Sequence, residues 1–229
     1  MKRLFCSFVI LVNLACSTAT ADVTLFDGTL NTTPNQQGWL YLTNPVFGSS
    51  SVQTPSSTGT VLDTTPSQSD QAGYFARFGG FSHPLMPILD RVSGYTISFD
   101  AAILSESHAS NNRAGFSVIV LGQDLAGIEL GFWTDRVWAQ SDSPLFTQAE
   151  SASLDTTGIT SYSITVLGSS YTLSAGGSAI LSGPLRNYSS FGSPYTTPSF
   201  LFLGDDTTSA SAKVKLAKVG VSTASVPEP

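Results

Sequence analysis

The sequence contains few charged residues, few histidines and almost no cysteine. Only 11% of its 229 residues are charged, well under the ~25% usual in globular proteins. The 16 acidic residues outnumber the 10 basic ones and give a net charge of −6. No basic stripe is present, which argues against nucleic acid or anionic lipid as a partner. Cys6 and Cys16 both lie in the first 21 residues, a segment that we expect to be removed. The mature chain would then have no disulfide and no cysteine metal site.

Polarity comes instead from small uncharged residues, and the chain has 20 glycines and 12 prolines. This composition is typical of short strands joined by tight turns, whereas long surface helices need more glutamate and lysine. A hydrophobic content of 41%, with 14 phenylalanines and 7 tyrosines, is too high for a disordered chain and is enough for a sizeable core. We therefore expect one domain built mainly from strands.

Residues 114–141 predict three consecutive antiparallel strands. Turns at 122–124 and 134–136 separate three runs that alternate with the period of a strand. Such a meander is too apolar to stand alone in water, so we expect further strands to cover it. Residues 95–104 show the clearest alternation in the chain. Their apolar members lie on one face of the predicted strand: Tyr95, Ile97, Phe99, Ala101 and Ile103.

Local patterns predict some of the remaining details. Gly176-Gly177 stands between two apolar runs and predicts a hairpin. A change of phase near Ala217 predicts a β-bulge in the last strand. Residues 144–157 are polar and are the only stretch in which we expect a helical turn. No period of 20–50 residues repeats, which argues against a solenoid or a propeller.

About a dozen short strands without convincing helices predict an all-β fold, a two-sheet antiparallel sandwich. In a jelly roll the first and last strands usually pair, and residues 23–26 beside 219–221 would do so. The succession of strands and hairpins from about residue 22 to 222 resembles the concanavalin A-like (laminin-G-like) jelly roll. This resemblance rests on pattern more than on any invariant motif. It implies one sandwich domain over residues 22–222.

Residues 1–21 have the layout of a secretory signal peptide. A basic start and an apolar stretch lead to the small-residue end Ala19-Thr20-Ala21, and we expect cleavage after Ala21. The apolar stretch is shorter than the ~20 residues of a membrane-spanning helix. Lipidation at Cys16 is the alternative, which Asn13 disfavours because it stands where bacterial lipoproteins carry an aliphatic residue. We expect an exported protein.

Val226-Pro227-Glu228-Pro229 stand at the end of the sequence. Behind a signal peptide and a β-domain with little charge, they resemble the start of a PEP-CTERM sorting signal. In that family the motif precedes a transmembrane helix and an arginine-rich tail, and an exosortase processes it. Neither segment follows here. Residues 223–229 would be a linker and the start of the motif, and two alternatives stay open: the remainder is missing, or the protein is released.

The body of the chain also resembles the bacterial "choice-of-anchor" domains, which have no assigned chemistry. Together these resemblances imply a protein of the cell surface or extracellular space, in a bacterium of Gram-negative type. They imply exopolysaccharide, surface proteins or an exosortase as partners, and membrane contact only through a C-terminal anchor.

Candidate catalytic groups are scattered along the sequence. Glucanases of concanavalin A-like fold need two or three closely spaced carboxylates on one strand, but Glu106, Glu129 and Glu150 stand apart. His83 and His108 are predicted to be ordinary loop residues, because no nucleophile motif accompanies them. Only carboxylates that the fold brings together from different strands, about 5 to 9 Å apart, would favour a hydrolase.

Two short segments are candidate binding sites. Asp205 and Asp206 follow a buried strand and could supply oxygen ligands to Ca²⁺, although one acidic pair falls short of the six to eight oxygens that this ion takes as a rule. An aspartate that caps a turn is the alternative. Trp133, Asp135 and Trp138 flank a tight turn, and aromatic rings beside a carboxylate are typical of sugar binding, although core packing also explains the tryptophans.

These observations favour an exported, non-enzymatic β-sandwich that needs no cofactor and associates with exopolysaccharide or surface proteins. A lectin-like module, with or without Ca²⁺, is the second hypothesis. A glycoside hydrolase is the third.

Overall fold

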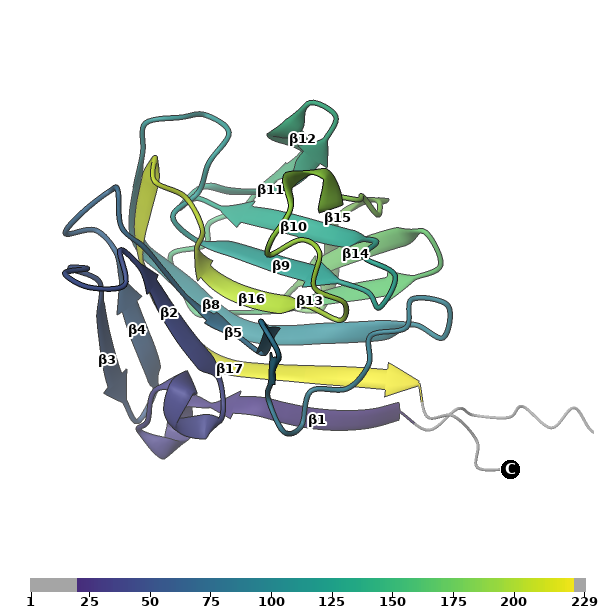
Figure 1. Cartoon of the computed structure of the whole chain (residues 1–229), viewed down its shortest axis with the longest axis horizontal. Coiled ribbons are helices and arrows are strands. Elements are labelled where there is room, and N and C mark those ends of the chain that lie inside the picture. Colours follow the sequence, from purple (N-terminus) through teal and green to yellow (C-terminus); the bar gives the residue numbers. More distant parts are fainter. Residues whose placement is uncertain (1–19, 225–229) are drawn as a thin grey trace, which may run out of the picture.

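The computed structural model describes residues 20–224, which form a sandwich of two antiparallel sheets (Figure 1). The all-β prediction is confirmed. The helices of this part of the chain are three short 3-10 turns: η1 (Gly28–Leu30), η2 (Pro34–Gln37) and η3 (Ser189–Phe191). No helix within residues 20–224 has the length and apolarity to cross a membrane. Ala19 and Val226 to Pro229 lie outside the described residues.

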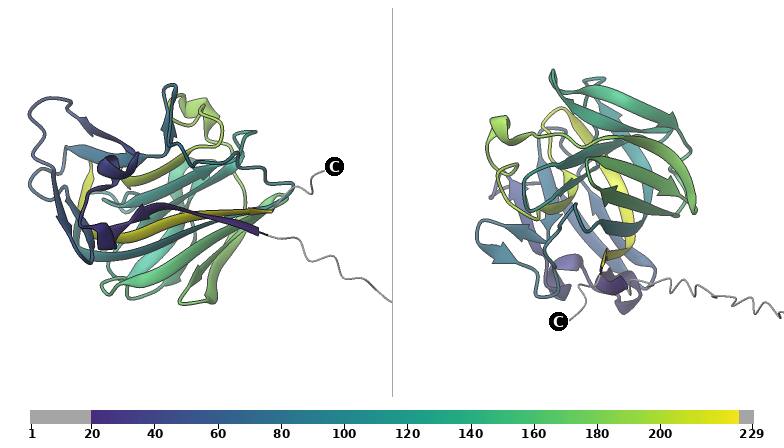
Figure 2. Two further views of the ribbon diagram at one scale, coloured as in Figure 1. Left: turned by 90° about the horizontal axis from the view of Figure 1, so that it is seen from below. Right: turned by 90° about the vertical axis from the view of Figure 1, so that its right-hand side faces the viewer.

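The first sheet has eight strands. Seven of them follow the order β15 (Ser178–Pro184), β14 (Ser170–Ala175), β13 (Thr160–Leu167), β8 (Tyr95–His108), β17 (Ala210–Ala224), β4 (Gly59–Asp63) and β3 (Val52–Ser56). The eighth, β1 (Thr20–Asp27), contains Ala21 and pairs with β17. Figure 2 shows the two layers from two other sides, with the start of β1 beside the end of β17.

β17 changes partner along one edge. Its first part pairs with β4, and its second part pairs with β1, where Val23 lies opposite Val221. The register with β8 shifts between Leu216 and Lys218, at the same point. This confirms the predicted bulge near Ala217 and the predicted pairing of the first and last strands.

The second sheet has seven strands, in the order β12 (Leu145–Ser153), β11 (Arg136–Asp142), β10 (Gly127–Phe132), β9 (Ser117–Leu121), β16 (Leu201–Asp205), β5 (Gln71–Phe75) and β2 (Leu40–Asn44). Neighbouring β9, β10 and β11 are the predicted meander. The predicted hairpin at Gly176-Gly177 joins β14 to β15. A small two-stranded sheet, β6 (Arg77–Phe78) with β7 (Phe81–Ser82), lies apart.

Two local predictions are wrong. The helical turn expected within residues 144–157 is strand β12, because Phe146 is buried and the segment pairs with β11 along the sheet edge. His108, predicted to be a loop residue, is the last residue of β8, because this strand continues past residue 104 against β17. In both cases a neighbouring strand supplies the backbone hydrogen bonds of a polar segment whose own sequence pattern does not indicate a strand.

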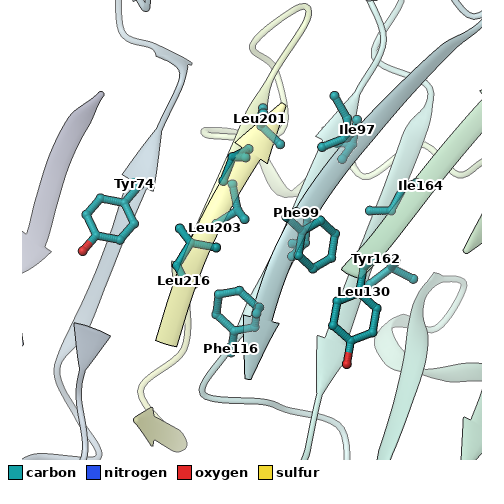
Figure 3. Packing of buried hydrophobic residues seen from close by; sticks show 14 of the residues in the cluster. Tyr74, Ile97, Phe99, Phe116, Leu130, Tyr162, Ile164, Leu201, Leu203 and Leu216 are labelled. Carbon is teal, nitrogen blue, oxygen red and sulfur yellow. The ribbon is translucent and has the colours of Figure 1, made fainter. Parts of the chain in front are cut away.

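The main core fills the space between the two sheets (Figure 3). The alternating residues predicted for β8 all point into it and are at most 3% exposed. Across the core, Phe99 meets Phe132 of the second sheet at a centroid separation of 5.9 Å. Because neighbouring residues of a strand face opposite sides, the residues of β9, β10 and β16 that alternate with core positions lie on the outer face of the second sheet. That face carries the site described next.

Candidate functional site

A pocket of about 440 Å³ opens on the outer face of the second sheet. Its walls are largely aromatic and come from β5, β6, β12, β16 and the segment around η3: Phe75, Phe78, Phe146, Phe191 and Phe202. Its polar end is formed by Arg113, Tyr195, Asp205 and Asp206. Its volume lies in the range of small-molecule sites, which are mostly apolar with a few converging polar groups.

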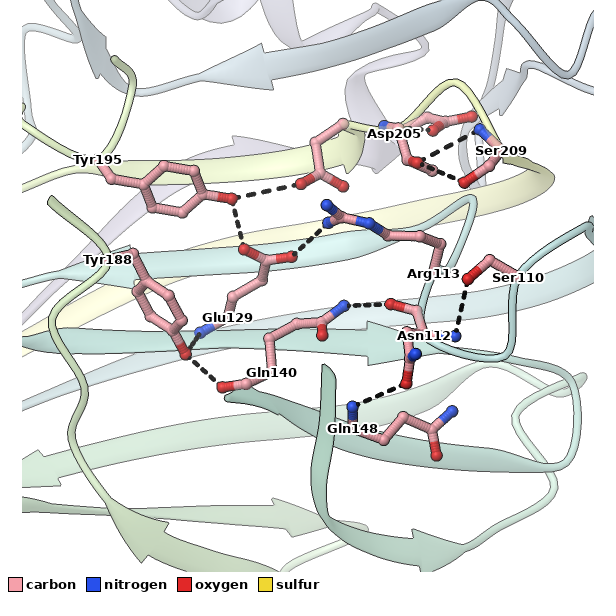
Figure 4. A network of polar contacts seen from close by, with 12 residues as sticks. Ser110, Asn112, Arg113, Glu129, Gln140, Gln148, Tyr188, Tyr195, Asp205 and Ser209 are labelled. Atoms are coloured by element: carbon pink, nitrogen blue, oxygen red, sulfur yellow. Dashed lines mark hydrogen bonds and ion pairs between the residues drawn. The ribbon is translucent and has the colours of Figure 1, made fainter. Parts of the chain in front are cut away.

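Glu129 lies beneath this polar end. It is the one acidic residue of β10, faces away from the core and is 0% exposed. The Tyr195 hydroxyl donates a hydrogen bond to Glu129 Oε2 at 2.5 Å and lies 3.5 Å from Asp206 Oδ2 (Figure 4). Asp206 comes directly after β16, two strands away from β10. The fold therefore brings together two carboxyls that are 77 positions apart in sequence, numbered 129 and 206.

The Arg113 guanidinium approaches the same group. Its Nη1 is 3.9 Å from Glu129 Oε1, and its Cζ lies 4.3 Å from the centroid of the Phe146 ring. The Trp133 indole holds this segment by donating to the Arg113 carbonyl at 2.9 Å. We call Arg113, Glu129, Tyr195 and Asp206 the polar cluster.

Neighbouring side chains on the outer face support the polar cluster. The Tyr188 hydroxyl donates to the Gln140 carbonyl at 2.6 Å and accepts from the Glu129 backbone N–H at 3.3 Å. Gln140 Nε2 donates to the Asn112 carbonyl at 2.9 Å, next to Arg113. Glu129 Oε1 and Gln140 Oε1 are buried and have no hydrogen-bond partner among the described residues.

The environment changes how the two carboxyls titrate. Burial raises the pKa of Glu129 well above its ordinary value, and negative charge on Asp206 raises it further. Burial also raises the pKa of Asp206, against the opposing charge of Arg113. The pair therefore keeps a proton to a higher pH than two exposed carboxyls would. A retained acidic proton beside a phenol hydroxyl is the chemistry of general acid–base catalysis.

Asp205 and Asp206, predicted as a joint calcium site, point to different partners. Asp205 accepts from the Thr64 hydroxyl at 2.7 Å and from the Thr207 N–H at 3.1 Å, whereas Asp206 faces Tyr195. Within residues 20–224, no group of three or more histidine, cysteine or acidic side chains could hold a metal ion. Calcium binding stays a prediction that the structure does not test.

The buried Asp205 carboxyl predicts a pH dependence of stability. Burial raises the pKa of Asp205 from 3.8 to about 9. Because the folded state keeps a proton that the unfolded state loses, this stabilisation is complete below pH 3.8 and is lost as the pH rises to about 9. Asp205→Asn should flatten the fall in unfolding free energy over that range, measured by urea denaturation. Asp135→Asn, at an exposed turn, should leave the pH dependence of the unfolding free energy unchanged. If Asp205→Asn showed the same pH dependence as the wild type, Asp205 would not be its source.

Trp133 and Trp138, predicted as sugar-binding residues, are buried. Trp133 is 7% exposed and stacks on His108 at 3.8 Å, and Trp138 is 0% exposed and meets Trp133 edge-on at 4.6 Å. Asp135 is exposed at the turn, where it contacts Arg136. None of these three residues lines the aromatic pocket.

The other acidic residues and the histidines take structural positions. Glu106 contacts His108 Nδ1 at 2.8 Å. Glu150 contacts Arg186 and accepts from the Tyr171 hydroxyl at 2.8 Å. His83 is buried, and its Nε2 lies 2.9 Å from the Gln37 carbonyl oxygen. Sequence reasoning missed the grouping of Glu129 with Asp206, together with Arg113 and Tyr195. The available signal was a lone glutamate in an otherwise apolar strand.

Comparison of the sequence with family models and with curated proteins finds no match. Solved structures do match. The carbohydrate esterase of the Shiga toxin-encoding bacteriophage phi24B aligns with a TM-score of 0.59 and 11% identity, over 90% of this chain and 100% of that one. The Crh5 transglycosylase in complex with NAG aligns with 0.50 and 13%, over 93% and 86%. A sialidase aligns with 0.54 and 11%, over 90% of this chain and 18% of that one.

These similarities support a jelly-roll β-sandwich of the kind found in carbohydrate-active proteins. They contradict the hypothesis of a non-enzymatic surface protein with a lectin-like alternative, because these matching chains are an esterase, a transglycosylase and a sialidase. Identities of 11–13% establish the fold and no particular reaction. The reaction has to be argued from the pocket.

Proposed function

We propose that the protein is a carbohydrate-active enzyme that cleaves a saccharide in the aromatic pocket by general acid–base chemistry. One observation carries this proposal: Glu129 and Asp206 meet at a single tyrosine hydroxyl, at the polar end of a pocket with aromatic walls. Aromatic rings offer flat apolar surfaces to the C–H faces of a sugar ring, and the carboxyls supply the proton that a leaving oxygen needs.

The positions of the residues assign their roles. Asp206 and Tyr195 line the pocket and can touch a substrate. Asp206 gives its proton to the oxygen of the leaving group as the glycosidic C–O bond breaks. A water molecule then bonds to the sugar carbon, and the proton that it loses returns to the Asp206 carboxylate and restores the acid. The Tyr195 hydroxyl contacts both carboxyls and holds Asp206 in place. Glu129 is fully buried and is a positioning residue that holds the Tyr195 hydroxyl.

Two other reaction types receive less support from the pocket. Acyl transfer by a serine needs an adjacent base such as histidine, but the described lining holds Ser193 and neither His83 nor His108. A retaining glycosidase needs a second carboxylate that reaches the sugar as a nucleophile. Glu129 is buried behind Tyr195, and Asp205 is 1% exposed and bonded to Thr64 and Thr207, so neither has such access.

We also propose that the enzyme acts outside the cell on a surface or matrix polysaccharide. The signal-peptide pattern of residues 1–21 and the resemblance of Val226 to Pro229 to a PEP-CTERM signal support this location. The protein recovered from an expressing bacterial culture should begin at Asp22, as determined by mass spectrometry. A protein retained in the cytoplasm with an intact first residue would contradict export.

A screen of polysaccharides tests the activity. The full chain is incubated with neutral and acidic polysaccharides, and new reducing ends are measured together with unsaturated ends. We expect cleavage of at least one polymer by the wild type and by Asp135→Asn, an acid-to-amide change at an exposed turn outside the pocket. Tyr195→Phe and Asp206→Asn should lose that cleavage. Equal activity in all four proteins would place the reaction elsewhere.

A further inference from the structure

The pocket combines an acidic polar end with a single basic side chain. Arg113 is the one basic residue in the described lining, beside Asp205 and Asp206 and in front of the buried Glu129. The guanidinium is already engaged. It lies 3.9 Å from Glu129 Oε1 and over the Phe146 ring, and its charge acts on Asp206.

An acidic sugar would therefore lack a partner here. A carboxylate ligand is normally held by a charge-assisted, often bidentate, pair with arginine or lysine. In this pocket Arg113 would have to leave the pair of Glu129 and Asp206, and the negative charge that remains on the pair would then face the carboxylate of the ligand. Like charges brought together in a partly buried site are strongly unfavourable. The protein as a whole is also acidic, with a net charge of −6, and so does not steer anions toward the pocket.

The rest of the polar lining is uncharged. Asn44 and Gln71 stand at the rim, where Asn44 Nδ2 donates to Gln71 Oε1 at 2.7 Å and Gln71 Nε2 donates to the Asp206 carbonyl at 2.6 Å. Thr43 and Ser193 add hydroxyls. Amides and hydroxyls both donate and accept, which suits the hydroxyl groups of a neutral sugar.

We propose that the pocket takes a neutral saccharide and discriminates against uronates and other acidic sugars. This inference rests on the proposed function, since it concerns the same pocket. The discrimination comes from the lack of a second basic side chain in the described lining and from the carboxyls of the polar cluster.

Isothermal titration calorimetry with two tetrasaccharides tests the inference. Cellotetraose is the neutral probe and tetragalacturonate the acidic one, each titrated into the full chain at the same low ionic strength. We expect the neutral probe to bind at least about tenfold more tightly than the acidic one. Added salt should reduce this difference, because it screens the repulsion.

A matched pair of variants checks the cause. Leu42 lines the pocket on β2 and is 38% exposed, so a polar replacement there should be tolerated. Leu42→Lys should strengthen binding of tetragalacturonate at least about threefold relative to Leu42→Gln, which adds a polar chain without charge. An acidic probe that binds the wild type as tightly as the neutral one would overturn this inference and leave the proposed function standing. Failure of both probes to bind, together with no cleavage of any polymer in the screen, would overturn both.

Discussion

Asp206→Asn is expected to lower kcat by about 10²–10⁴-fold, the usual contribution of one positioned proton donor. The amide has nearly the same shape as the carboxyl and can occupy the same place beside Tyr195, but it has no acidic proton to give. Because the loss affects the chemical step, kcat should fall much more than KM rises. Steady-state kinetics on the polymer identified by the screen measures both constants.

The pH profile of activity distinguishes Asp206, the general acid, from Glu129, which positions Tyr195. Burial raises the pKa of Glu129 and of Asp206, so wild-type activity should persist to a higher pH than an exposed carboxyl allows and then fall as the proton is lost. Glu129→Gln removes the nearby titrating group and should move this limit while retaining part of the activity.

Retention of kcat within about twofold in Asp206→Asn would contradict its role as the acid.

The fold could be predicted because its signals are local. In β8 every second residue from Tyr95 to Ile103 enters the core, so the period of the sequence is the period of the strand. The bulge near Ala217 is also visible in the sequence, as a change of phase. β12 was missed because an edge strand with one buried phenylalanine hardly alternates in hydrophobicity.

The site could not be predicted from spacing because its parts come from separate strands and loops. Glu129 belongs to β10, Asp206 follows β16, and Tyr195 lies in the connection before β16. Their meeting depends on the strand order β10, β9, β16, in which a strand early in the meander pairs with one from near the end of the chain. A lone glutamate in an apolar strand indicates a buried polar partner, but it does not say which residue that partner is.

For the two tryptophans the sequence predicted a function that their positions do not support. Aromatic rings beside Asp135 suggested sugar binding, but Trp133 and Trp138 are both buried. Trp138→Ala is expected to lower the free energy of unfolding by about 3–5 kcal/mol, the usual cost of removing a buried large aromatic side chain. The ring is 0% exposed, packs against Trp133 and fills the space over Gly131, where a Cβ atom would lie 2.7 Å from it. Urea denaturation measures the change.

Phe47→Ala is the matched control, because Phe47 is 91% exposed and its removal should change stability by no more than about 0.5 kcal/mol. Trp138→Ala should also disturb the site indirectly. Trp133 rests on Trp138 and donates to the Arg113 carbonyl, so the Arg113 segment loses part of its support. Saccharide affinity should then fall together with stability. A Trp138→Ala protein of wild-type stability that no longer binds cellotetraose would instead identify the indole as a direct ligand contact.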